Sequence, residues 1–215
     1  MSDAPGAEAP SWSLHVVDDD APFRRSLVFL LESMGWEVRA HASADEFLAE
    51  GLVELKRLGC LLLDVRMPGM SGLELQQQLK ARGCHFPIIF LTGHGDVELA
   101  VQAMKFGAFD FLEKPFKDQK LLDAVSAALR QREIDQMGQA RAQQACQRLA
   151  RLSPREAEVA RLVARGLPNK LVARELDISE RTVHVHRQHV MEKTAVSSAA
   201  ELARLMLQAD PQALG

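Results

Sequence analysis

The chain has 215 residues, a length that suits one large domain or two small ones. Apolar residues make up 47% of it, which excludes a wholly disordered protein. Residues 1–139 hold 14 Lys and Arg against 21 Asp and Glu, whereas residues 140–215 hold 12 against 8. An acidic first part and a basic second part indicate two domains with different partners, the second suited to a polyanion such as DNA.

The first residues of the chain carry neither a basic segment nor an apolar one, so they do not resemble a secretory signal. The apolar runs farther along are too short to span a bilayer. We therefore expect a cytoplasmic protein that has no membrane partner.

Residues 1–11 are rich in Ala, Pro and Gly, which predicts a disordered tail. Short apolar runs then alternate with stretches of helical period. Strands are expected at Leu14–Val17, Glu37–His41, Gly59–Leu63, Pro87–Leu91 and Phe109–Leu112. Helices are expected at Pro22–Met34, Ala44–Ala49, Gly72–Ala81 and Val97–Met104, and from Asp118 onward. This alternation predicts an α/β doubly wound fold, a five-stranded parallel sheet of order 2-1-3-4-5 with helices on both faces.

Polar side chains follow four strands of this predicted sheet. Asp18 and Asp19 follow the first strand, Asp64 the third, Thr92 the fourth and Lys114 the fifth. Ligands of doubly wound sheets bind outside the carboxyl ends of the strands, so we expect these side chains to converge. Crowded carboxylates need a cation, and their oxygen atoms suit Mg²⁺, or Mn²⁺ in its place. Asp64 could then attack a phosphorus centre, with Lys114 and Thr92 contacting the phosphoryl oxygens.

Each of these residues also has an ordinary structural interpretation. The acids at positions 18–20 could cap the helix that begins near Pro22, and Asp64 could start a turn. A haloacid-dehalogenase-like phosphatase would need a second acid where Arg66 stands. A flavodoxin-like protein would need a phosphate loop where the acids stand. The hypothesis of phosphoryl transfer therefore rests on the ordered combination of residues.

Residues 131–149 are polar and rich in Gln, Ala and Arg, which predicts a helical linker. Ser153, Pro154 and Glu156 form a complete helix start, with N-cap, N1 and N3 residues in order. Helices are expected over residues 154–164, 168–176, 180–193 and 199–208. This separate all-α domain has the short helix, tight turn and longer helix typical of a helix-turn-helix. Its third helix carries basic and amide side chains, but a solvated helix would carry them too.

Residues 12–130 resemble the receiver domain of bacterial two-component systems, through VVDDD (16–20), LLLDVRMPGMSGLEL (61–75), IIFLTGHGD (88–96) and GAFDFLEKPF (107–116). The resemblance implies that a sensor histidine kinase phosphorylates Asp64 and that the protein is no enzyme beyond this transfer and slow autodephosphorylation. It implies a metal bound by Asp18, Asp19, Asp64 and the Arg66 carbonyl. It implies a phosphoryl group contacted by Thr92 and Lys114, a cis bond before Pro115, and a switch position at Phe111, where many relatives have Tyr.

In this family, the face formed by the fourth helix and the fifth strand dimerises on phosphorylation. Val97, Val101, Phe106 and Phe109 are apolar there, although periodicity does not separate core from interface. One alternative remains open, a receiver that serves as a fixed dimerisation module and ignores phosphate.

Residues 150–210 resemble the LuxR-type helix-turn-helix domain of response regulators in the FixJ/NarL family, closest to FixJ-type activators. The matching segment is LSPREAEVARLVARGLPNKLVARELDISERTVHVHRQHVMEKTAVSSAAELARL (152–205). The resemblance implies promoter DNA and RNA polymerase as partners, and activation of transcription. The DNA-binding residues that it implies are Lys170, Arg181, His184, Val185, Arg187, Gln188 and Lys193. The histidines at 184, 186 and 189 are not expected to form a metal site, because their spacing does not place all three on one helix face.

Overall fold

The computed structural model describes residues 12–50, 57–93 and 97–214. The chain divides into two compact units that meet between Ile134 and Asp135. This division falls within the predicted linker at 131–149, whose own boundaries stay a prediction. The predicted tail at 1–11 lies outside the described residues.

The first unit is built on a parallel sheet of order β2-β1-β3-β4-β5, which confirms the predicted fold class. The strands are β1 (Ser13–Val17), β2 (Glu37–His41), β3 (Leu58–Asp64), β4 (Ile88–Thr92) and β5 (Asp110–Glu113). Every residue of β1, β3 and β4 is buried, whereas the edge strands β2 and β5 are partly exposed. Helices on both faces explain why the central strands are almost wholly apolar.

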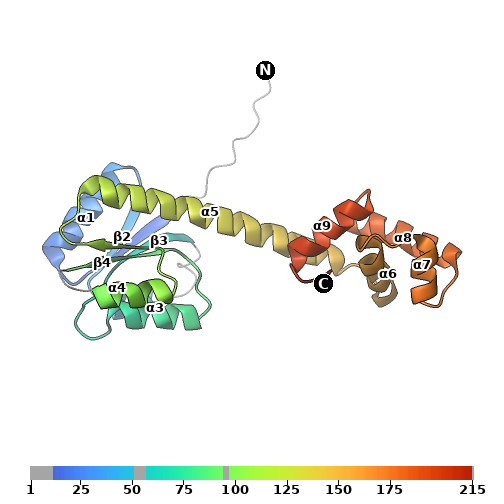
Figure 1. Ribbon diagram of the computed structural model, residues 1–215. Coiled ribbons are helices and arrows are strands. Elements are labelled where there is room, and N and C mark those ends of the chain that lie inside the picture. Colours follow the sequence, from blue (N-terminus) through green and yellow to red (C-terminus); the bar gives the residue numbers. More distant parts are fainter. Residues whose placement is uncertain (1–11, 51–56, 94–96, 215) are drawn as a thin grey trace, which may run out of the picture. The chain divides into compact units, whose positions relative to one another are not determined.

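The helices of this unit form two layers. They are α1 (Ala21–Ser33), α2 (Ala44–Ala49), α3 (Gly72–Ala81), α4 (Val97–Lys105) and α5 (Asp118–Leu149). Helices α1 and α5 cover one face of the sheet (Figure 1). Leu31 of α1 and Val125 of α5 pack in the core on that face. Phe47 of α2, Leu79 of α3 and Ala103 of α4 pack in the core on the other. The sheet is therefore covered on both sides, with its strand ends left at the edge between the layers.

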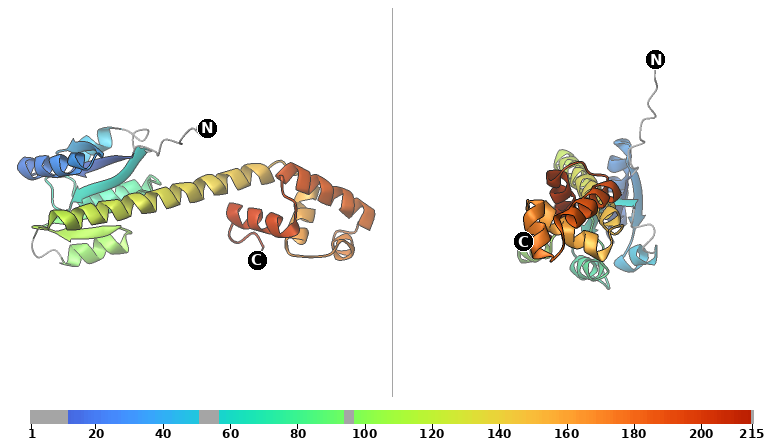
Figure 2. Two further views of the ribbon diagram at one scale, coloured as in Figure 1. Left: turned by 90° about the horizontal axis from the view of Figure 1, so that it is seen from above. Right: turned by 90° about the vertical axis from the view of Figure 1, so that its right-hand side faces the viewer.

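The second unit is all helical, as predicted (Figures 1 and 2). Its helices are α6 (Pro154–Ala164), α7 (Asn169–Glu175), α8 (Glu180–Thr194) and α9 (Ala199–Ala209). The predicted helix start at Ser153 is confirmed, because its side chain and that of Glu156 form a reciprocal capping box. Valines and leucines with nearly no exposed surface form the core: Val159, Val163, Val172, Val183, Val190 and Leu202.

None of the helices in the described ranges combines the length and the apolar character that crossing a lipid bilayer requires.

Candidate functional site

The strand register brings two of the predicted acids together. Val17 of β1 lies beside Leu63 of β3, so the next residues, Asp18 and Asp64, are neighbours at the carboxyl ends of these strands. Both are buried, with 0% and 7% of their surface exposed. Two carboxylates this deeply buried require a positive charge close by, because an unpaired buried charge is very costly.

Lys114 supplies that positive charge. Its ammonium Nζ donates to Asp18 Oδ2 at 2.7 Å and to Asp64 Oδ1 at 2.6 Å. The same nitrogen lies 4.1 Å from the centre of the Phe23 ring, a cation–π contact. The peptide bond between Lys114 and Pro115 is cis, as the resemblance implied.

The other oxygens of the two buried acids bind backbone amides. Asp64 Oδ2 accepts from the Arg66 amide at 2.8 Å, and Asp18 Oδ1 accepts from the Asp20 amide at 2.9 Å. Asp20 is itself the N-cap of α1, while Asp19 is exposed at the rim. The capping interpretation is therefore correct for Asp20, whereas Asp18 is paired with Lys114 and its predicted role as a metal ligand stays a prediction.

Thr92 and Phe111 lie on the neighbouring strands. Thr92 ends β4 with 1% of its surface exposed, and its hydroxyl donates to the Gly93 carbonyl at 3.3 Å. The backbone amide of Lys114 donates to the Thr92 carbonyl at 2.6 Å, which fixes the lysine beside β4. Phe111 of β5 is half-buried and packs against the core formed with α3 and α4.

Burial and charge act on the Asp64–Lys114 pair in opposite directions. Burial raises the pKa of Asp64, although the hydrogen bond and charge of Lys114 oppose that rise. Burial alone would lower the pKa of Lys114, but its hydrogen bonds to Asp18 and Asp64 outweigh burial and raise it. Lys114 is therefore held in its charged form beside the buried acids.

Carboxylate oxygens are hard ligands that suit Mg²⁺, and those of Asp18 and Asp64 already share one cation, the Lys114 ammonium. Asp19 and the Arg66 carbonyl would complete the protein ligands, with water at the remaining positions. In the described ranges, two groups of three His, Cys, Asp or Glu have ligand atoms within 4.8 Å of one another. The acid pocket is not one of these groups, so the four predicted ligands stay a proposal.

The predicted DNA-contacting residues fall mostly on one exposed face of α8. This face carries exposed side chains that recur at helical spacing, those of Arg181, His184, Val185 and Gln188. The opposite face of the helix is buried through Val183 and Val190. Val185 is 43% exposed, so its side chain is accessible to a partner on this face. On α7, Lys170 is also exposed.

Two other predicted DNA-contacting residues have partners inside the second unit. Arg187 Nη1 donates to Asn169 Oδ1 at 3.1 Å, which joins α8 to α7. Lys193 Nζ lies 2.6 Å and 2.8 Å from the two carboxylate oxygens of Glu156. Neither contact was predicted from the sequence, since the partners lie 18 and 37 residues apart in the chain.

Gly72, the first residue of α3, also contributes to the acid pocket and was missed. A Cβ at this position would lie 2.2 Å from the Asp64 carbonyl oxygen, so only glycine allows the helix to approach β3 this closely. The signal was present in the MSGLEL segment, where Ser71 caps the helix that Gly72 begins.

Comparison with known proteins agrees with this arrangement. Residues 14–126 match the response regulator receiver domain family, and residues 150–206 match the luxR family of bacterial regulatory proteins. The chain is therefore a two-component response regulator that carries a LuxR-type DNA-binding domain, and it belongs to the FixJ/NarL family.

Individual relatives match along nearly the whole chain. The chain is 52% identical over 198 residues to the transcriptional regulatory protein FixJ of Azorhizobium caulinodans, covering 92% of each. It is 50% identical over 196 residues to FixJ of Bradyrhizobium diazoefficiens, covering 91% of this chain and 95% of the relative. The solved structure of the response regulator StyR matches with a TM-score of 0.79 and 45% identity, over 91% of this chain and 98% of that one.

Proposed function

We propose that Asp64 is the phosphoacceptor through which a sensor histidine kinase controls DNA binding by this protein. The observation that carries the proposal is the buried Asp18–Asp64 pair, whose carboxylates share the Lys114 ammonium at 2.7 Å and 2.6 Å. A lysine that bridges two acids is already in position to neutralise a further anion bonded to one of them.

The transfer needs little from the protein besides positioning and charge. An oxygen of the Asp64 carboxylate bonds to phosphorus while the phosphorus–nitrogen bond of the donor phosphohistidine breaks, and the imidazole leaves. Mg²⁺ or Mn²⁺ held by Asp18, Asp19, Asp64 and the Arg66 carbonyl would supply charge neutralisation during this step. Lys114 and the Thr92 hydroxyl then hydrogen-bond the phosphoryl oxygens. We propose no enzymatic role beyond this transfer and slow autodephosphorylation, in which water hydrolyses the aspartyl phosphate and releases inorganic phosphate.

The new phosphoryl group adds a charge of about −1.5 to −2. Thr92 moving toward it would repack Phe111 and the adjoining face of α4 and β5. Val101 and Phe106 support a dimer on this face, because they are 48% and 40% exposed. Phe109 is partly buried in the core, and the side chain of Val97 lies outside the described part of the chain.

A dimer carries two copies of the second unit. Its two α8 helices can then bind paired half-sites in double-stranded promoter DNA. Gln188 and His184 would face base edges, and Val185 would offer an apolar contact to a thymine methyl. Arg181 and Lys170 would bind the phosphate backbone of the DNA. We propose that the complex acts in the cytoplasm and contacts RNA polymerase to activate transcription.

Labelling with acetyl phosphate, in the presence and absence of Mg²⁺, tests the phosphoacceptor. We expect one added phosphoryl group, dependent on the metal, on the peptide that contains Asp64, and none in an Asp64→Asn variant. Labelling of another residue would contradict the proposal. Absence of labelling together with unchanged DNA binding would favour the fixed dimerisation module.

A further inference from the structure

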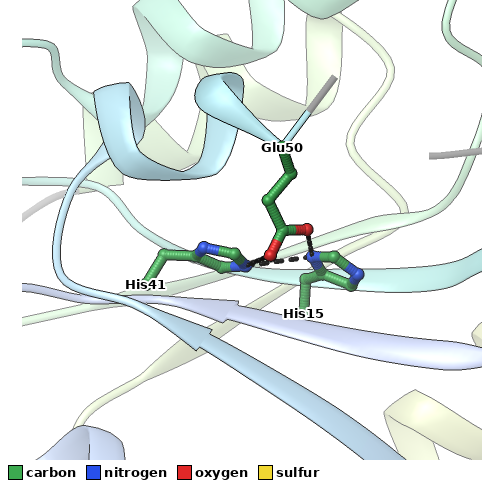
Figure 3. Close-up of side chains that lie close together, drawn as sticks. All are labelled: His15, His41 and Glu50. Carbon is green, nitrogen blue, oxygen red and sulfur yellow. Dashed lines mark hydrogen bonds and ion pairs between the residues drawn. The ribbon is translucent and has the colours of Figure 1, made fainter. Parts of the chain in front are cut away.

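A second group of ligand-type side chains lies in the first unit and has no part in the proposed phosphorylation. His15 in the middle of β1, His41 at the end of β2 and Glu50 just after α2 turn their polar atoms toward one another (Figure 3). The two imidazoles are buried, with 0% and 2% of their surface exposed. Phe47 of α2 packs edge-on against both rings.

The distances in this group are close to those between ligands of one metal ion. His15 Nδ1 lies 3.0 Å from His41 Nε2. Glu50 Oε2 lies 3.6 Å from His15 Nδ1, and Glu50 Oε1 lies 3.8 Å from His41 Nε2. Tetrahedral ligands about 2.0–2.1 Å from a Zn²⁺ ion are separated from one another by roughly 3.3 Å. The two rings are nearly parallel, so each would have to turn until its nitrogen lone pair points at a shared ion beside the carboxylate.

The contacts of Ser13 favour a proton on Nε2 of His15. The Ser13 hydroxyl donates to the Arg57 carbonyl at 3.3 Å, so its oxygen is left to accept from His15 Nε2 at 3.4 Å. A proton on Nε2 leaves the lone pair of Nδ1 facing His41 and Glu50. A histidine oriented through its other ring nitrogen in this way is typical of metal ligands.

Two further properties favour a cation at this place. Glu50 Oε2 is buried and has no hydrogen-bond donor within the described ranges. Burial lowers the pKa of His15 to about 3 and also lowers that of His41, so both imidazoles are neutral near pH 7, as metal ligands must be. Within the described ranges, Arg39 also places a positive charge beside this group, because its Nη1 lies 3.6 Å from Glu50 Oε2 and its side chain is 38% exposed.

We propose that His15, His41 and Glu50 form a binding site for a divalent transition metal ion of the Zn²⁺ class, with a fourth position open to water. Two imidazole nitrogens and one carboxylate suit Zn²⁺, Co²⁺ or Ni²⁺ and do not suit Mg²⁺, so this site and the acid pocket select different ions. A bound ion would join the edge strand β2 to β1 and to the end of α2, which stabilises this side of the first unit.

The test is a titration of the metal-free full-length protein with Co²⁺ in excess Mg²⁺, which occupies the acid pocket. We expect one equivalent of Co²⁺ to give the visible absorption of a low-coordinate nitrogen–oxygen site, and Zn²⁺ to abolish it. In a nitrogen-15 NMR spectrum of histidine-labelled protein, Zn²⁺ should shift His15 Nδ1 and His41 Nε2. Wild-type protein that shows neither response would overturn the proposal without recourse to any variant.

Variants separate this site from the second group of ligand atoms, Glu156 with His186 and His189. Glu50→Gln should weaken Co²⁺ binding at least tenfold. Asp45→Asn, which changes an exposed acid of the preceding helix α2, and His189→Ala should leave it unchanged. Arg39→Gln should strengthen binding several-fold, because it removes a repelling charge. Unchanged binding in Glu50→Gln, or loss of binding in His189→Ala, would contradict the assignment.

Discussion

Lys193 of α8 closes an ion pair with Glu156, the N3 residue of α6, at 2.6 Å. Glu156 also accepts the Ser153 amide and is only 4% exposed, so one carboxylate caps α6 and anchors α8. The hydrogen bonds from Lys193 and from the Ser153 amide lower the pKa of Glu156 from 4.5 to about 2. Lys193 therefore links α8 to the first turn of α6.

The depressed pKa of Glu156 predicts how the second unit responds to acid. A carboxylate whose pKa is lower in the folded state stabilises that state above its unfolded pKa of 4.5, and this contribution is lost as the pH falls from there toward about 2. Hydrogen exchange of peptides from α6 and α8, measured across this pH range, should show falling protection. In Glu156→Gln the protection of these peptides should be lower at pH 7 and should change less with pH.

A matched control lies on the same helix. Glu158 pairs with Arg155 at 2.6 Å, but both side chains are well exposed, so Glu158→Gln should change stability by less than about 1 kcal/mol. Glu156→Gln should cost about 1–2 kcal/mol, because it weakens a helix cap and a charged hydrogen bond. Equal losses in the two variants would show that the Glu156–Lys193 pair has no special role.

Gly72→Ala should disturb β3, the strand that ends at Asp64. The added methyl would meet the Asp64 carbonyl at 2.2 Å, so α3 or β3 must move. We expect a loss of about 1–3 kcal/mol in the free energy of unfolding, as for other overpacked sites, and slower labelling by acetyl phosphate. Gly138→Ala in α5 is the control, because a Cβ there meets nothing within 4 Å and alanine favours a helix.

Removing Lys114 should shift the pH dependence of phosphorylation. Burial already raises the pKa of Asp64, and the lysine opposes that rise. In Lys114→Met the pKa of Asp64 should rise further. The ionised carboxylate would then form only at higher pH, so the labelling rate should reach its maximum at a higher pH than in the wild type. A rate profile that superimposes on that of the wild type would contradict this role of the ammonium.

The exposed face of α8 predicts which variants change sequence recognition. Gln188→Ala should reduce the preference of the phosphorylated protein for a duplex selected from a random-sequence pool by about 1–3 kcal/mol. Lys170→Ala should instead weaken binding to all sequences and reduce the salt slope by about one. Gln208→Ala, an exposed glutamine on α9, should have no effect on either measurement.

The sheet order and the acid pocket could be predicted because their determinants are local and ordered along the chain. Each apolar run ends at its polar residue, and the parallel register then brings Asp18, Asp64 and Lys114 together. Parallel strands align their carboxyl ends, so strand position was enough to place these three residues, although Asp19 by the same rule is exposed at the rim.

The remaining contacts depend on tertiary packing between distant segments. Nothing in the local sequence joins Lys193 to Glu156, and an exposed basic residue on a recognition helix favours DNA as its partner. His15 and His41 lie 26 residues apart and meet only because β1 and β2 pair in register. Strand alternation could have indicated that both face the α2 side, but not that Glu50 would reach them.

The most direct test of the account is DNA affinity measured with and without a phosphodonor in the wild type, in Asp64→Asn and in the surface control Asp45→Asn. We predict that phosphorylation raises the affinity of the wild type and of Asp45→Asn by about tenfold or more, through paired half-sites, and leaves Asp64→Asn unchanged. An equal rise in Asp64→Asn would contradict control through this carboxylate.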